Sequence, residues 1–377
     1  MDKGILYVIA LFFIIGGIDY ILGNRWKLGE KFEEGVKAMG VLGLGMIGIY
    51  SIAPLMAGIL SDMIVPIARR LHLDPSIVPA SFIAIDMGGY QLAQTLGLTR
   101  EMASFSGVIL ASTLGATITF TIPIMLTMIQ EEEQYIFSKG VMAGLIAIPA
   151  GCLAGGLYQG IKFSILMRNL IPIFVFSMLL AIGLLYMPHL FMKGFCLIGR
   201  GIKGISIIGL ILQGINTISG VTWIPGLVSI EEVMTVVGKI AFVLGGAYPM
   251  IACLTRFFRP ALQRCGKYFG INAAAVGGLA GNLASNLLVF ADYQNMNDKG
   301  KMVCIASSVS MAFVFGGQLG FVSAMDPEWI TAFMIAKLVG GLLSVWLALW
   351  IFEREGKEQN IGSQKIMIKN EELRMKN

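Results

Sequence analysis

An aspartate followed by two glycines lies in the middle of an apolar stretch, SFIAIDMGGYQLAQ at residues 81–94. An ionised carboxylate in the hydrocarbon of a bilayer is costly, so Asp86 must face protein or water, or take up a proton. Gly88 and Gly89 favour local unwinding of a helix, which frees backbone carbonyl oxygens. A carboxylate beside free carbonyls can bind a cation, and Tyr90 adds an aromatic face or a hydroxyl. The pattern predicts a cation-binding site; a buried aspartate that only joins two helices is the alternative.

A second polar group, GNLASN, lies in another apolar stretch at residues 281–286. Asn282, Ser285 and Asn286 are spaced i, i+3 and i+4, so they share one face of a helix. Neutral amides cannot balance a cation, but they can hydrogen-bond to a hydroxyl or an amine. We therefore predict that these residues line the same site as Asp86, with hydrogen bonding between neighbouring helices as the alternative.

Two further charged residues lie within apolar stretches. Asp19 is near the end of the first stretch, where it can reach the interface and pair with Arg25, and it is a candidate site residue. Lys337 lies roughly ten residues inside the last stretch, too deep to reach water easily along the membrane surface. It is predicted to pair with an aspartate such as Asp86.

Glycine is abundant, with 47 residues, and most glycine pairs are typical of tight helix packing in membranes. Tyr248 next to Pro249, in LGGAYPM, combines a helix break with an aromatic side chain. Gln318, in FGGQLGF, is another polar side chain within an apolar segment. Tyr248 and Gln318 complete the predicted substrate-binding set, and Gln213 is a weaker candidate of the same kind.

The composition indicates a membrane protein. Of the 377 residues 56% are hydrophobic and 14% are charged, and the mean hydropathy is +0.77. Soluble domains carry about a quarter charged residues. The sequence therefore predicts an all-α polytopic membrane protein whose main surroundings are lipid. The net charge of +5 needs no nucleic acid to explain it, because Lys and Arg concentrate in cytoplasmic loops.

The reactive residues are too few for most enzymes. The two histidines, His72 and His189, and five cysteines without a CxxC pair make a metal site or a histidine-based triad improbable. No GxxxxGK[ST] motif is present, so the chain is not expected to hydrolyse ATP. We expect neither catalysis nor a cofactor.

Apolar stretches of about 20 residues, the length that crosses a bilayer as a helix, recur along the whole chain. The first is interpreted as a membrane span rather than a signal peptide, because no cleavage site follows it. The eleven candidates lie near 4–22, 36–60, 77–96, 103–128, 138–160, 165–187, 198–218, 233–255, 271–290, 302–322 and 328–352.

Loop charge discriminates between two topologies. If segments 77–96 and 271–290 enter the membrane and return on the same side, about 20 Lys and Arg lie on one side and about 7 on the other. If all eleven segments cross, the bias is weak. The charge distribution favours nine full spans, two broken or re-entrant segments, an external N-terminus and a cytoplasmic C-terminus.

The two re-entrant candidates also suggest an internal repeat. Each follows a basic amphipathic stretch and precedes a span rich in small residues, so 36–160 and 233–352 are interpreted as inverted repeats, an arrangement common in transporters. Chance similarity among glycine-rich helices is the alternative. We expect one transporter domain at 1–352 and a charged cytoplasmic tail at 353–377.

Several segments together resemble one known family, in order and in spacing over most of the chain. They are FEEGVKAMGVLGLGMIG (32–48), DMGG (86–89), IPAGCLAGG (148–156), LGGAYPM (244–250), GNLASN (281–286), GGQLGF (316–321) and KLVGG (337–341). The chain resembles the ethanolamine utilization permease family, whose members are integral membrane transporters of bacteria that degrade ethanolamine. It departs from that pattern at Gly317-Gln318, where other members carry an acidic residue and a histidine, and at Ser285, where they carry an asparagine.

The resemblance implies an ethanolamine permease of the bacterial inner membrane. Ethanolamine is a small ammonium with a hydroxyl, so Asp86 would bind the ammonium and Asn282 or Asn286 the hydroxyl. A transporter of another small amine or an amino acid is an alternative, and a membrane-embedded enzyme is disfavoured because no nucleophile or paired carboxylates are evident. Proton coupling, sodium coupling and facilitated diffusion stay open, as does a homo-oligomeric state.

Overall fold

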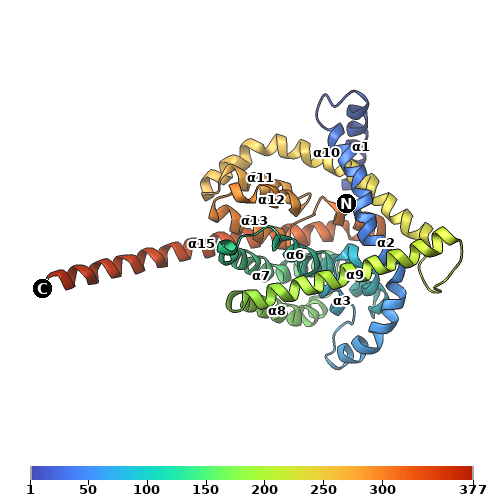
Figure 1. The fold of residues 1–377 in the computed structure, drawn as a ribbon, viewed down its shortest axis with the longest axis horizontal. Coiled ribbons are helices and arrows are strands. Elements are labelled where there is room, and N and C mark those ends of the chain that lie inside the picture. Colours follow the sequence, from blue (N-terminus) through green and yellow to red (C-terminus); the bar gives the residue numbers. More distant parts are fainter. Residues whose placement is uncertain (1, 376–377) are drawn as a thin grey trace.

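The computed structural model describes residues 2–375, which form helices and no strand (Figure 1). Eight helical stretches in this range are long and apolar enough to cross a bilayer, which confirms the predicted all-α polytopic membrane protein. Seven are α1 (Asp2–Ile21), α2 (Gly29–Arg70), α7 (Gln134–Tyr158), α8 (Phe163–Tyr186), α9 (Pro188–Ser219), α10 (Ile230–Phe269) and α15 (Ile330–Met375). The eighth, Arg100–Met125, consists of α5 (Arg100–Ser104), the π-helical η2 (Phe105–Gly115) and η3 (Thr117–Thr121), and α6 (Ile122–Met125).

Both segments predicted to be broken are broken. The first consists of α3 (Ile77–Phe82), η1 (Ile85–Met87) and α4 (Gly89–Leu96). The second consists of α11 (Ala273–Asn282) and α12 (Asn286–Ala291). Short 3-10 turns connect other elements: η4 (Glu131–Glu133), η5 (Tyr293–Asn295) and η6 (Pro327–Trp329).

The prediction of a continuous span at 302–322 is wrong. The chain forms α13 (Asp298–Ser310) and α14 (Gly317–Met325) with an irregular segment between them. Phe313 has φ +65° there, and the backbone amides of Phe313 and Phe315 donate to the carbonyls of Asn282 and Leu283 at 3.1 and 2.8 Å. The helix is interrupted because its backbone bonds to the break between α11 and α12 instead of to itself.

Each broken segment returns to the end of the molecule from which it started. Leu98 N donates to the Asp74 carboxylate at 3.1 Å, so the chain before α3 touches the chain after α4. Asn272 Nδ2 likewise donates to Asn295 O at 2.7 Å, which joins the two ends of the second segment. A continuous helix of 20 residues would separate its ends by about 30 Å. The re-entrant prediction for 77–96 and 271–290 is thus confirmed.

The loops gather into two groups. Residues 23–37, 129–139, 256–267 and 293–301 lie at what we call the basic end, where Lys301 pairs with Glu133 and Arg256 Nη1 donates to Trp26 O. Residues 71–76, 97–104, 159–162 and 326–329 lie together at the opposite end, where Leu98 N donates to Asp74 and Ser104 Oγ donates to Asp326. This grouping matches the loop sets that the charge distribution favoured.

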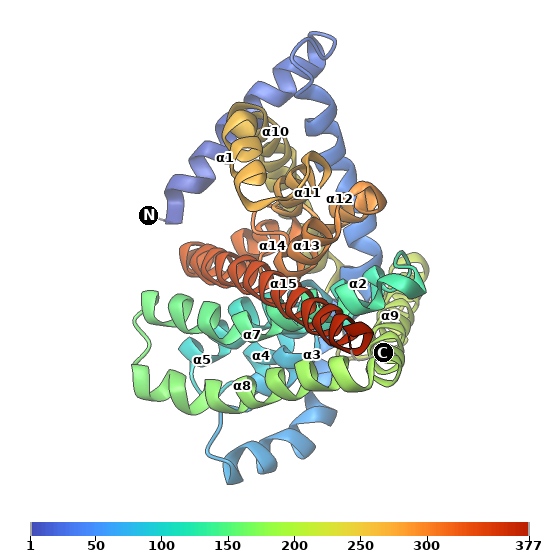
Figure 2. The ribbon, with the colours of Figure 1, turned by 90° about the vertical axis from the view of Figure 1, so that its left-hand side faces the viewer.

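Long helices from the two halves of the chain cross in antiparallel pairs. On α2 and α10, Gly35 lies against the backbone at Leu244, while Tyr50 donates to Glu232 at 2.9 Å. On α7 and α15, Gly151 packs against Gly340, and Lys139 near the start of α7 pairs with Glu355. Figure 2 shows α15 between α7 on one side and α13 and α14 on the other. Glycine at these crossings lets the backbones approach closely.

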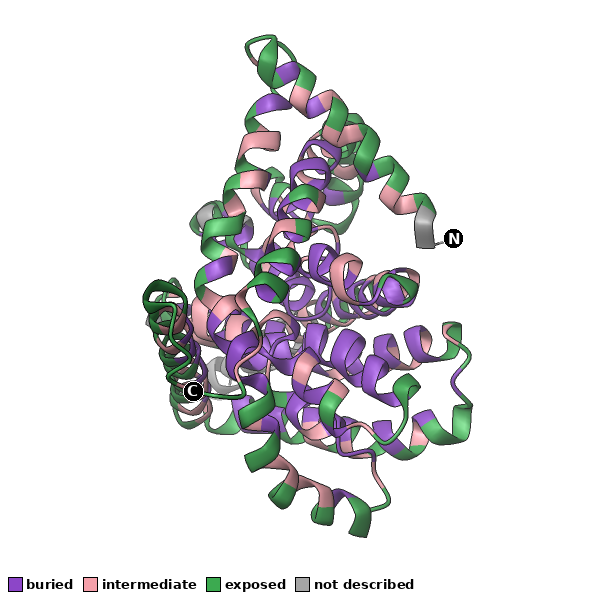
Figure 3. Ribbon diagram, turned by 90° about the vertical axis from the view of Figure 1, so that its right-hand side faces the viewer, coloured by how far each residue is buried: buried purple, intermediate pink, exposed green. Residues whose placement is uncertain are grey.

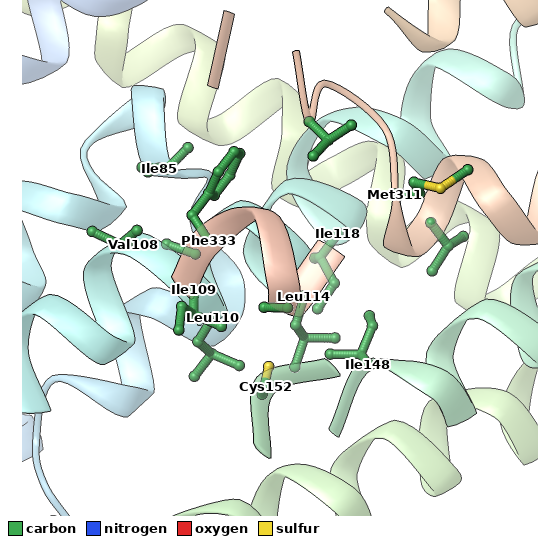
Figure 4. Packing of buried hydrophobic residues seen from close by; sticks show 14 of the residues in the cluster. Ile85, Val108, Ile109, Leu110, Leu114, Ile118, Ile148, Cys152, Met311 and Phe333 are labelled. Atoms are coloured by element: carbon green, nitrogen blue, oxygen red, sulfur yellow. The ribbon is translucent and has the colours of Figure 1, made fainter. Parts of the chain in front are cut away.

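Burial follows from these crossings. Buried residues concentrate in the centre of the helical body, and exposed ones follow its outer helices (Figure 3). Ile109, Leu110 and Leu114 of η2 pack against Cys152 of α7 and Phe333 of α15 (Figure 4). Apolar side chains such as Leu11 of α1, Phe174 of α8 and Ile208 of α9 are exposed, as expected where a helix faces lipid.

The charged C-terminal stretch continues α15. The sequence predicted a charged tail at 353–377 without a defined conformation. In the structure the helix runs on to Met375 and extends out of the body (Figure 1). Residues 376–377 of the predicted tail lie outside the described range.

The α2–α10 crossing gives a stability prediction. A Cβ at Gly35 would collide with the Leu244 carbonyl and lie 2.7 Å from Gly245 N, so Gly35→Ala should lower stability by about 1–3 kcal/mol. Gly40→Ala on the same helix meets nothing within 4 Å and should be neutral or stabilising by up to about 1 kcal/mol. Thermal unfolding of the two purified variants in detergent measures the difference. Equal melting temperatures would contradict the crossing.

The ion pair at the basic end gives a pH prediction. Burial raises the pKa of Glu133, but hydrogen bonds from Lys301, the Gln130 backbone and Gln294 outweigh this effect, so the pKa lies below its ordinary value of 4.5. The pair therefore contributes its full stability above pH 4.5 and loses it as pH falls through the lower, folded-state pKa.

Glu133→Gln should consequently lower the melting temperature at about pH 7. Between about pH 7 and about pH 4 the melting temperature of this variant should decrease less than that of the wild type. The reason is that a neutral amide cannot pair with the Lys301 ammonium at any pH. Glu132→Gln, at the exposed neighbouring position, is the matched control and should keep the wild-type profile. A Glu133→Gln profile parallel to wild type would rule out a contribution from this pair.

Candidate cation-binding site

The break between α3 and α4 is built by its glycines. Gly88 has φ +97°, a backbone conformation that favours glycine. A Cβ at Gly89 would collide with Ile83 O and lie 2.8 Å from Ala84 O. The Ala84 amide donates to Thr119 Oγ1 at 3.2 Å, so the unwound segment is tied to the π-helical stretch of the neighbouring span.

The Asp86 side chain lies in this break and lines a cavity of about 1120 Å³. The residue is half-buried, and no other described residue hydrogen-bonds to its carboxylate or forms an ion pair with it. A carboxylate that the protein leaves without a partner and that faces a cavity is available to a ligand. The cost of placing such a charge at this depth needs a compensating cation or water.

The cavity extends from the basic end of the molecule to the helix breaks. Exposed charged residues surround it at the basic end, on the first turns of α2 and the last third of α10. They are Glu30, Glu34, Lys37, Arg256 and Arg259. Deeper in, apolar side chains from α2, from the π-helical span and from the 311–316 segment replace them. The cavity therefore connects water at the basic end with Asp86.

Two phenylalanines that sequence analysis missed lie in the cavity wall. Phe120 of η3 and Phe313 of the 311–316 segment contact each other edge to face, with ring centroids 5.7 Å apart. Phe313 has φ +65°, a backbone conformation that residues other than glycine rarely adopt. Backbone strain of this kind is concentrated at functional sites. Aromatic faces beside a carboxylate are favourable surroundings for an ammonium ion.

Three other predicted residues also line the cavity: Tyr248, Ser285 and Gln318. Gln318 is 4% exposed, and its Oε1 has no hydrogen-bond partner. The Ser285 hydroxyl accepts from Leu287 N at 3.3 Å and so caps α12. The structure thus brings Asp86 together with these three residues, from α10, the α11–α12 break and α14.

Asn282 and Asn286 are not in the cavity wall, in contrast to the predicted position. Asn282 Nδ2 donates to Ser307 Oγ at 2.6 Å, and its Oδ1 accepts from Ser308 Oγ at 3.1 Å. Asn286 Nδ2 donates to Thr121 Oγ1 at 3.2 Å. Both amides hydrogen-bond between neighbouring elements, which was the alternative that the sequence left open.

Asp19 and Tyr90 also lie elsewhere. The Asp19 carboxylate accepts from the backbone amides of Trp26, Leu28 and Gly29 at 2.8–2.9 Å, where it stabilises the start of α2. It binds these amides rather than the Arg25 side chain as predicted. Tyr90 packs edge to face against Phe321, with ring centroids 5.5 Å apart, and does not line the cavity.

Lys337 is buried in the centre of the molecule at 2% exposure. Its ammonium donates to Ser112 O of η2 and to Ala312 O of the 311–316 segment, both at 2.8 Å. Asp86 lies near enough for the two charges to interact, but the hydrogen bonds of Lys337 go to carbonyls. Among the described residues no group of three or more His, Cys, Asp and Glu could hold a metal ion.

Comparison with known proteins places the chain in a family. The family model described as "Ethanolamine utilisation protein, EutH" matches residues 1–351. A Listeria monocytogenes protein named "Probable ethanolamine permease EutH" is 39% identical over 98% of this chain and 99% of its own.

Two other relatives are similar over nearly the whole chain. A Salmonella typhimurium protein of the same name is 34% identical over 95% of this chain and 97% of its own. "Uncharacterized protein YxeR" of Bacillus subtilis is 38% identical over the same shares of the two chains. No solved structure matches the chain. With its spanning helices and these full-length relatives, the chain is a multi-pass protein of the bacterial cytoplasmic (inner) membrane and belongs to the EutH family of ethanolamine utilisation proteins.

Proposed function

We propose that this protein is a permease that carries ethanolamine across the bacterial cytoplasmic membrane. The observation that carries the proposal is the Asp86 carboxylate, which lines a membrane-embedded cavity without a protein partner. An ammonium group can bind this carboxylate directly, because no protein group hydrogen-bonds to it. The names of the Listeria and Salmonella relatives, probable ethanolamine permease, support the same substrate.

The remaining cavity residues fit the rest of ethanolamine. The faces of Phe120 and Phe313 suit the ammonium and its two methylenes. The unpartnered Oε1 of Gln318 can accept a hydrogen bond from the substrate hydroxyl, the role that the sequence assigned to Asn282 or Asn286. Gln318 therefore replaces the two asparagines in the proposed site, with Ser285 and Tyr248 as further polar neighbours.

Transport by alternating access is supported by the order of elements. In each half a long helix, a re-entrant broken segment, an irregular span and a straight helix follow one another, and the corresponding helices cross antiparallel. This supports inverted repeats at 36–160 and 233–352 that move against each other. The basic end faces the cytoplasm under the positive-inside rule, so the cavity opens inward.

Another small amine is the second candidate substrate. The site departs from the family pattern at Gly317-Gln318 and Ser285, and these residues line the cavity. Uptake of labelled ethanolamine by proteoliposomes, with choline, ethylamine and amino acids as competitors, distinguishes the candidates. Competition by an amino acid stronger than that by ethanolamine itself would reject the proposed substrate.

Asp86→Asn should reduce ethanolamine uptake by more than tenfold, because removing one partner of a buried charge pair costs about 2–5 kcal/mol. The matched control is Asp62→Asn, which changes an exposed aspartate of α2 outside the cavity and should transport like wild type. Uptake is normalised to the amount of each variant in the membrane. Wild-type uptake by Asp86→Asn would remove Asp86 from the site.

Gln318→Leu should reduce the preference for ethanolamine over ethylamine, which lacks the hydroxyl, by about tenfold. The control is Gln213→Leu, because Gln213 is equally buried at 5% exposure and also has an unpartnered Oε1, but lies on α9 outside the cavity. It should keep the wild-type preference. The readout is the KM for each amine, and an unchanged ratio in Gln318→Leu would show that the hydroxyl binds elsewhere.

A further inference from the structure

The two carbonyls that hold Lys337 come from irregular segments in different halves of the chain. Ser112 lies in the π-helical stretch η2, and Ala312 lies in the interruption between α13 and α14. In transporters built from broken helices, carbonyls of unwound segments coordinate monovalent cations such as Na⁺. Here a lysine ammonium lies at 2.8 Å from both oxygens, in the position that such an ion would take.

We propose that Ser112 O and Ala312 O constitute a monovalent-cation site, with the Asp86 carboxylate as a nearby counter-charge, and that the Lys337 ammonium permanently occupies this site. The protein consequently carries its own cation at the crossing of the irregular segments and binds no sodium there. The consequence for transport rests on the permease function proposed above, whereas the site itself does not.

The surroundings of Lys337 favour a fixed cation over a mobile one. The side chain is 2% exposed, and it enters from α15 between η2 and α13. Its ammonium lies 5.6 Å from the centroid of the Phe333 ring on the same helix. Hydrogen bonds to two carbonyls and an aromatic neighbour hold the charge in place.

The cation site formed by the two carbonyls lies next to the substrate cavity. Ala312 precedes Phe313, which lines the cavity in its strained conformation. The interaction of the Lys337 charge with Asp86 connects the site to the carboxylate proposed to bind substrate. Lys337 is therefore a positioning residue: it holds the segment that carries Phe313 and supplies a counter-charge, and it need not touch the substrate.

Truncation of Lys337 should expose the empty site to ions. In Lys337→Ala the side chain beyond Cβ is gone, so Na⁺ with water can bind the two carbonyls. We expect the melting temperature in N-methylglucamine chloride to fall by at least about 5 °C, and NaCl of equal ionic strength to restore part of the loss. Wild type should melt at the same temperature in both salts.

Two controls separate a specific site from a general salt effect. Lys337→Met fills the space with an apolar chain, so it should be destabilised without recovery in NaCl. Lys301→Ala removes another largely buried lysine, which pairs with Glu133 rather than with carbonyls, and it should likewise show no sodium-specific recovery. If Lys337→Ala is too unstable in N-methylglucamine chloride, purification in each salt gives the same comparison.

The outcomes are distinct. The proposal is overturned if sodium stabilises the wild-type protein. It is also overturned if Lys337→Ala melts at the wild-type temperature, or if sodium specifically neither restores its melting temperature nor permits its purification. For transport, wild-type uptake should be equal in NaCl and KCl, and a sodium requirement also overturns it. Absence of ethanolamine uptake in both salts would count against the permease function and leave the melting results to decide the cation site.

Discussion

Backbone groups that a helix break exposes inside a bilayer must find partners within the protein, because lipid offers none. The structure meets this constraint by placing its irregular segments against one another. The amides of Phe313 and Phe315 bond to the α11–α12 break, the Ala84 amide bonds to Thr119, and Lys337 bonds to carbonyls from both halves. The cavity is consequently lined by segments that are fixed although they are not helical.

The sequence predicted those breaks whose residues would be energetically unfavourable in an uninterrupted spanning helix. A charge at Asp86 and glycines at 88 and 89 are unfavourable in a plain spanning helix, so their presence indicated a break. Loop charge then favoured re-entry at 77–96 and 271–290, since only that topology collects the basic residues on one side. The contacts of Asp74 with Leu98 and of Asn272 with Asn295 confirm it.

The parts that the sequence could not predict depend on which side chain turns towards which neighbour. Asn282, Ser285 and Asn286 share a face only in a continuous helix, and the chain breaks at 283–285, which separates Ser285 from the two amides. Phe120 and Phe313 are ordinary apolar residues in sequence, and their place in the cavity wall depends on the backbone conformation at Phe313 and on the contact between the two rings. The break at 311–316 arises from hydrogen bonds to a segment some 30 residues earlier, so no local pattern marked it beyond the pair Gly316-Gly317.

The placement of Lys337 accounts for the availability of Asp86. If the lysine bonded directly to the aspartate, an incoming ammonium would have to break that bond before it could bind. Because the two carbonyls hold the ammonium, its charge lowers the cost of the buried carboxylate without occupying it. The empty site is then close to neutral, and a bound ammonium adds one positive charge. Under the permease function proposed above, a negative potential inside the cell would favour movement of that charge towards the cytoplasm, and the same pair of residues would make the empty carrier tolerable in the membrane.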